Sequence, residues 1–193
     1  MNIMIKIVCL GSLFLTFLSP HPVIALGDDF VILPGDVLHI NVWKEDGMDQ
    51  DVLVLPDGTI TFPLIGTLKA RDMSPAKLQA AIRDKLNPFI PDAAVTVSVQ
   101  APTGHKVSLV GQLREPGEVV LTARMSVMQA ISQVGGLTPY ADEDDIIVIR
   151  ENADGEKEKI SIPYNAITKG RDLEKDISLL PGDVVVVPAS GLF

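Results

Sequence analysis

The pentapeptide Leu-Pro-Gly-Asp-Val occurs twice in the sequence, at residues 33–37 and again at residues 180–184. Proline presets φ for a turn, glycine accepts a positive φ, and aspartate bonds nearby backbone N–H groups. An apolar run follows each copy, so each turn is expected to lead into a buried strand. The flanking sequences do not align, and the motif is therefore interpreted as a repeated turn, not a repeat architecture. Its turn residues are Pro34, Gly35, Asp36, Pro181, Gly182 and Asp183.

The residues that follow the first copy have the alternation of β-strands. In the run 37–43 every second residue is apolar, which predicts a strand whose inward face carries Leu38, Ile40 and Val42. Farther along, Asp57-Gly58 separates the apolar runs 52–55 and 59–62. Because Asp-Gly is a strong two-residue turn signal, these two runs are expected to form a hairpin.

Each half of the chain also predicts one main helix. Ser74 is an N-cap residue for a helix with apolar residues on one stripe at Leu78, Ile82 and Leu86. In the second half Ser126 and Gln129 form a capping box, and Gly135-Gly136 follows the helix as a left-handed stop. The fold class expected is α+β, with two small β-rich domains.

The N-terminal residues 1–25 have the pattern of a secretory signal peptide. Lys6 precedes an apolar run at residues 7–18, and Ala25 is a small residue suited to the cleavage position. The run is well short of the ~20 residues that a bilayer-spanning helix needs. An uncleaved anchor or a buried first helix is the alternative. Cys9 lies inside the apolar run, which is not the position of a lipid-anchor cysteine.

Composition excludes several classes of protein. The chain has 193 residues, 47% hydrophobic residues and a net charge of -9, which excludes a disordered chain. A single Cys excludes a disulfide scaffold, and an acidic chain without clustered cations is a poor nucleic-acid binder. The motifs of serine hydrolases and phosphate-binding loops are absent from the sequence, so we expect neither catalysis nor a cofactor.

Two features have competing interpretations. The acidic run at residues 142–145 lacks the spacing of a calcium loop, and we expect a solvated loop that protects a strand edge, without a metal site. Trp43 is a candidate glycan contact, because an indole stacks on the apolar face of a sugar ring. The alternative for Trp43 is a cap on a strand end or a contact at an interface.

Taken in order, these motifs resemble bacterial polysaccharide export proteins of the outer membrane. The segment 30–100 resembles their N-terminal export domain, on the residues at 33–38, 57–60 and 62–66 and the helix after Ser74. The segment 106–188 resembles an SLBB domain, a soluble ligand-binding β-grasp module, on the residues at 110–111, 115–117, 128–131, 135–137, 148–150 and 180–188. We divide the chain into a signal peptide (1–25), an export domain (26–102) and an SLBB domain (103–193).

The resemblance implies a component of exopolysaccharide or capsule export in the periplasm and outer membrane of a Gram-negative bacterium. Relatives form homo-oligomeric rings that enclose a conduit, and their partner is an inner-membrane co-polymerase, often coupled to a tyrosine kinase that controls chain length. The sequence shows one SLBB segment and no amphipathic helix after Val187. We therefore expect it to dock on a separate outer-membrane protein or to form a short periplasmic ring.

Two other functions remain open from the sequence. One is a freestanding periplasmic glycan-binding module that hands the polymer to a separate channel. The other is a glycan lyase or hydrolase, which needs a carboxylate pair or a histidine-based site. No residues of this chain are assigned to such a catalytic site.

Overall fold

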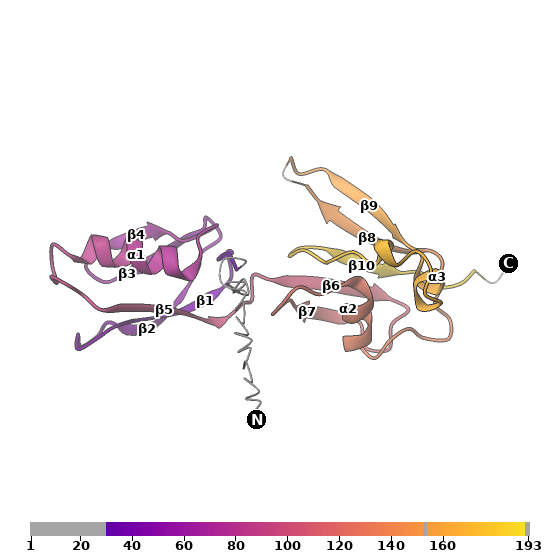
Figure 1. Ribbon diagram of the computed structural model, residues 1–193, viewed down its shortest axis with the longest axis horizontal. Helices are drawn as coiled ribbons and strands as arrows, with labels where there is room; N and C mark the ends of the chain where they lie inside the picture. Colours follow the sequence, from indigo (N-terminus) through magenta and orange to yellow (C-terminus); the bar gives the residue numbers. More distant parts are fainter. Residues whose placement is uncertain (1–29, 153, 192–193) are drawn as a thin grey trace, which may run out of the picture.

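The computed structural model describes residues 30–152 and 154–191. Figure 1 shows two domains side by side along the long axis, joined by one short connector between strand β5 (Val95–Ala101) and strand β6 (Lys106–Gly111). The predicted signal peptide lies outside the described residues. Within the two described ranges, no helix combines the length and apolar character needed to cross a membrane.

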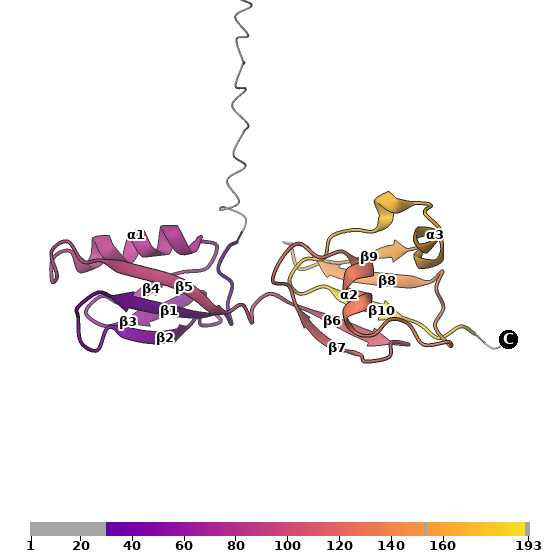
Figure 2. The same cartoon turned by 60° about the horizontal axis from the view of Figure 1, so that its bottom comes forward.

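The first domain has two layers. One layer is a three-stranded antiparallel sheet in the order β2-β1-β5, and the other holds the hairpin β3-β4 and helix α1 (Figures 1 and 2). The elements are β1 (Val37–Val42), β2 (Asp49–Leu53), β3 (Thr59–Phe62), β4 (Gly66–Lys69), α1 (Pro75–Leu86) and β5 (Val95–Ala101). The predicted inward residues of β1 are buried, and so is the apolar stripe of α1.

The predicted hairpin around Asp57-Gly58 is wrong in its pairing. The turn forms, since Gly58 N–H donates to Leu55 O, but β2 pairs with β1 and β3 pairs with β4. The two runs therefore leave the turn toward different sheets. A turn motif specifies a local reversal, whereas pairing depends on which apolar face each strand can bury.

The second domain is a mixed five-stranded sheet in the order β7-β6-β10-β8-β9, with helix α2 packed on one face (Figure 2). Strand β10 runs parallel to β6 and antiparallel to β8, so the first and last strands of the domain lie side by side. This is the predicted β-grasp arrangement. The elements are β6 (Lys106–Gly111), β7 (Gly117–Val120), α2 (Val127–Gln133), β8 (Ile146–Glu151), β9 (Lys157–Ile162), α3 (Tyr164–Thr168), the 3-10 helix η1 (Leu173–Lys175) and β10 (Val184–Val187).

Helix α2 begins and ends as the sequence predicts. The Ser126 hydroxyl accepts from Gln129 N–H, the Gln129 side chain accepts from Ser126 N–H, and both glycines after the helix have positive φ (78° at Gly135 and 85° at Gly136). The short helices α3 and η1 were not anticipated, because each is too short to show a helical period.

The two domains have separate hydrophobic cores, one within residues 32–97 and one within residues 107–187. The acidic loop at residues 142–145 precedes β8, which is paired on both sides. The prediction that this loop protects a strand edge is therefore wrong. The edge strands of this sheet are β7 and β9, and β9 carries Lys157 and Lys159, charged side chains of the kind that discourage edge-to-edge pairing.

Candidate functional site

The first Leu-Pro-Gly-Asp turn is closed by its own aspartate. Asp36 N–H donates to Leu33 O at 3.1 Å, and the Asp36 carboxylate accepts from Leu33 N–H at 2.9 Å. Gly35 has φ of 94°, the left-handed conformation that the motif predicts. Gly35 N–H donates to Val54 O, and Val54 N–H donates to Asp36 O. The turn is therefore anchored to the segment that follows β2.

The same carboxylate also clamps the connector between the domains. Asp36 is fully buried and accepts from the backbone N–H of Gly104 at 2.8 Å. Nε2 of His105 lies 3.3 Å from the Asp36 carboxylate and 3.1 Å from Val31 O, to which it donates. The His105 ring is stacked on Phe30, with ring centroids 4.5 Å apart. One carboxylate and one imidazole thus join the first domain to the start of β6.

Gly104 fits this clamp only because it has no side chain. A Cβ at this position would lie 2.6 Å from Pro34 O and 2.9 Å from the Asp36 carboxylate. The Thr103 hydroxyl adds a hydrogen bond to Gly35 O. The connector is therefore in close backbone contact with the first turn, and a substitution that adds a Cβ must displace one from the other.

The second turn repeats the first in its local geometry. Asp183 N–H donates to Leu180 O at 3.1 Å, and its carboxylate accepts from Leu180 N–H at 2.8 Å. Gly182 has φ of 91°. Gly182 N–H donates to Lys106 O, and Ser108 N–H donates to Asp183 O. The second turn is therefore anchored to β6, directly after the connector that the first turn holds.

The second carboxylate has a different partner. Arg150 on β8 forms a two-pronged contact with Asp183: Nε donates at 2.9 Å and the terminal nitrogen at 2.6 Å. The same nitrogen donates to Ser178 O. Hydrogen bonding to Asp183 raises the pKa of the Arg150 guanidinium above its ordinary value. The pair is charged, and it joins β8 to the segment at residues 178–183.

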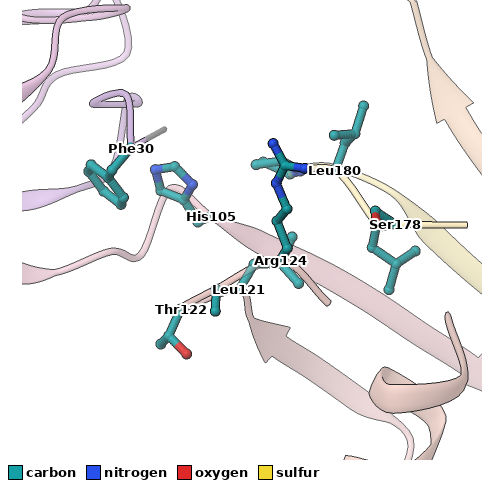
Figure 3. Close-up of a pocket in the computed structure, with 10 residues that line it drawn as sticks. Phe30, His105, Leu121, Thr122, Arg124, Ser178 and Leu180 are labelled. Carbon is teal, nitrogen blue, oxygen red and sulfur yellow. The ribbon is translucent and has the colours of Figure 1, made fainter. Parts of the chain in front are cut away.

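A pocket of about 550 Å³ lies at the domain junction, beside the second turn, and is lined by residues that include Phe30, His105, Leu180 and Pro181. Figure 3 shows Phe30 and His105 on one side of it, Ser178 and Leu180 on the other, and Arg124 between them. The lining is mainly apolar, with a few polar groups at Thr122, Arg124 and Ser178. The junction thus offers a concave surface that both domains contribute to, which is the usual location of a binding site.

The other residues singled out from the sequence lie away from this junction. Trp43 follows β1 at the opposite end of the first domain and is 67% exposed. The carboxylate of Asp57 accepts from the side chain and the backbone N–H of Thr59, and these hydrogen bonds lower its pKa. Gly135 and Gly136 follow α2. The functional roles of all these residues stay predictions.

Sequence reasoning missed three residues that bind the two turns or the connector between the domains. From the sequence, no contact was assigned to His105, which is only 8% exposed, to Gly104, or to the side chain of Arg150. The available signal was the motif itself: a turn aspartate that precedes a buried strand needs partners for two carboxylate oxygens. Which partners it finds depends on residues distant in the chain.

Comparison with known proteins agrees with this architecture. Residues 25–100 match the family described as Polysaccharide biosynthesis/export protein, and residues 105–187 match the SLBB domain. Two relatives from Escherichia coli, both named Polysialic acid transport protein KpsD, are each 26% identical to this chain over 131 residues. The match covers 67% of this chain and 24% of each relative, so the chain spans about a quarter of their length.

The two matched regions meet at the clamped connector described above. Their order, together with the β-grasp sheet, defines a polysaccharide export protein with an export domain followed by an SLBB domain. The chain belongs to the bacterial polysaccharide export protein family.

Proposed function

We propose that this protein is a non-catalytic component of an exopolysaccharide or capsule export machine, located in the periplasm and associated with the outer membrane. Its copies assemble side by side into an oligomeric conduit for the polymer. In a cyclic assembly each interface joins two different faces of neighbouring subunits, so every subunit must hold its two domains in one orientation.

The observation that carries this proposal is the clamp at the domain junction. Asp36, Gly104 and His105 connect the two domains through buried hydrogen bonds, and the second turn holds the start of β6. Domains joined by a flexible linker sample many orientations, whereas a clamped pair presents fixed surfaces. Fixed surfaces are what a closed ring requires.

The cargo and the partners of this protein are inferred by analogy with other members of its family. We propose a polysaccharide as cargo, an inner-membrane co-polymerase or chain-length kinase as partner, and a separate outer-membrane protein as the exit. Relatives named for polysialic acid transport support an export role. The identity of this chain's polymer is not assigned.

A deletion strain tests the function. We expect loss of secreted and surface polysaccharide, retention of polymer in the cell, and restoration by the intact gene. Fractionation of the complemented strain should place the protein in the periplasm or with the outer membrane. Normal secretion by the deletion strain contradicts the proposed function.

Assembly is tested separately, by cross-linking in cells and by mass measurement of the purified protein. A discrete species larger than a dimer supports the conduit. A strictly monomeric protein that binds glycan supports the second candidate, a freestanding glycan-binding module. The exposed indole of Trp43 is the specific observation that favours this alternative.

A further inference from the structure

One face of the three-stranded sheet in the first domain is uncovered. Helix α1 and the β3-β4 hairpin lie on one side of β1, β2 and β5, and within residues 30–101 no helix or strand lies on the other side (Figures 1 and 2). Residues of β1 alternate between buried and partly exposed, and residues of β2 and β5 pair with them in register. The side chains on the uncovered side are Val37 and Leu53 near the junction and, farther along, the polar residues His39, Asn41, Asp49, Asp51, Thr96 and Ser98, which we call the polar face.

The centre of the polar face is held in place by His39. Nδ1 of its ring lies 2.9 Å from Oδ1 of Asp51, and Nε2 lies 3.1 Å from Oδ1 of Asp49. Both contacts use one oxygen of each carboxylate, so the second oxygen remains an acceptor for a ligand. The carboxylate side chains are 60% (Asp49) and 55% (Asp51) exposed.

An aromatic ring stands at one end of this face. Trp43 continues the β1 ladder, because its N–H donates to Ala94 O at 3.0 Å. Alternation along β1 then places its side chain on the same side as Asn41. Trp43 is 67% exposed, whereas a large aromatic residue is usually mostly buried in a folded protein.

The polar face does not extend over the whole uncovered side, because the register also places Val37 opposite Leu53 there, and Leu53 is 52% exposed. The corresponding side of the second domain's sheet carries Ser108 beside aliphatic residues at Val110, Ile147, Ile149, Val184 and Val186. Val110 is 42% exposed, so this chain tolerates apolar side chains on an open sheet. The polar side chains are therefore gathered around His39, between the exposed Leu53 and the exposed Trp43.

We propose that the polar face and Trp43 form a glycan-binding platform for uncharged sugars, an inference that rests on the proposed export function. The indole stacks on the apolar side of a pyranose ring, while Asn41 and the two carboxylates bond its hydroxyl groups. Asp49 and Asp51 repel carboxylated sugars, so acidic glycans are disfavoured. A row of hydrogen bonds at an open surface gives weak, reversible binding, as a conduit needs.

The experiment uses the purified protein and Trp43 fluorescence, because the chain has one Trp. Probes are cellohexaose, maltohexaose and laminarihexaose as uncharged glycans, and oligogalacturonate and α2,8-linked sialic acid oligomers as acidic ones. We expect a saturable emission change with at least one uncharged probe, and at least tenfold weaker binding of the acidic probes.

Variants then locate the binding. By calorimetry, Trp43→Ala should weaken binding of the responsive probe at least tenfold, and Asn41→Ala by about threefold to tenfold. Asp51→Asn should reduce the preference against acidic probes. Tyr140→Ala is the matched control, since Tyr140 is an exposed aromatic (73%) in the second domain and should leave binding unchanged.

The platform is contradicted if no probe changes the emission, or if the acidic probes bind more tightly than the uncharged ones. It is also contradicted if Trp43→Ala binds the responsive probe as tightly as the unmodified protein does, or if Trp43→Ala changes the mass of the oligomer without changing glycan binding. The last would make this face a contact between copies. None of them bears on export itself, which is judged by the deletion strain. The platform and the proposed function therefore fail independently.

Discussion

The two Leu-Pro-Gly-Asp turns have the same backbone geometry but different carboxylate partners. Asp36 accepts from the connector, at Gly104 N–H and near His105, whereas Asp183 binds the guanidinium of Arg150. The first turn therefore connects the two domains to each other, whereas the second turn connects segments within the second domain. The local sequence specifies the turn, and the surrounding fold determines what the turn stabilises.

The difference also lies in charge. Asp183 is paired with a cation that is always protonated, in a largely buried contact (Arg150 22% exposed, Asp183 1%). Asp36 is held mainly by neutral donors. Substitutions at the two aspartates should therefore differ in how much stability they remove and in whether they loosen one domain or the junction. Four predictions, two of them at neighbouring or contrasting sites, test this difference.

The largest effect is expected for Asp183→Ala. It leaves Arg150 without its partner, which costs about 3–5 kcal/mol in the free energy of unfolding of the second domain. Denaturant unfolding measures the loss. The double variant Asp183→Ala/Arg150→Met should recover part of it, because no unpaired charge remains. If the double variant is less stable than the single one, the unpaired cation is not the cause.

Asp36→Ala should have a smaller effect, about 2–3 kcal/mol, because it leaves the N–H groups of Leu33 and Gly104 without an acceptor but strands no permanent cation. Its distinctive result is a broader distribution of distances between spin labels placed in the two domains. Asp183→Ala should leave that distribution narrow. Equal broadening in both variants would contradict the division of roles between the turns.

Gly104→Ala tests the close approach of connector and turn. The added Cβ meets Pro34 O, and such overpacking costs about 1–3 kcal/mol. We expect the mean distance between the labelled domains to shift. Gly117→Ala is the matched control, since a Cβ there meets nothing within 4 Å and should change stability by less than about 0.5 kcal/mol. A Gly104→Ala protein with unchanged distances would show that the connector tolerates displacement.

Asp57 provides the exposed counterpart of the two buried aspartates, and the smallest effect. Its folded-state pKa is lowered from 3.8 by the Thr59 hydrogen bonds. The stabilisation is therefore present above pH 3.8 and is lost as pH falls through the folded-state pKa. An NMR titration of the Asp57 carboxyl carbon should have its midpoint below 3.8, and Thr59→Val should raise it. A midpoint at or above 3.8 contradicts this interpretation.

The sequence predicts what is local in this fold. The φ of Gly35 and Gly182, the capping box at Ser126 and the buried stripe of α1 each depend on residues within a few positions of one another. The partners of the turn carboxylates do not: Asp36 and Gly104 are 68 residues apart, and Arg150 and Asp183 are 33 apart. For the same reason the Asp57-Gly58 turn was predicted and the pairing of its strands was not.

The parallel pairing of β10 with β6 affects the order of folding. Strand β10 lies between β6 and β8, so the five-stranded sheet remains in two pieces until Val184–Val187 is available. Strand pairing across a large sequence separation is slow, because loop closure precedes the stabilising contacts. As the exported chain emerges from the inner membrane with its N-terminal part first, the first domain can fold early while β6 and β8 still have unpaired strand edges. A chaperone that binds extended apolar strands should therefore associate with the second domain, and should dissociate once β10 inserts.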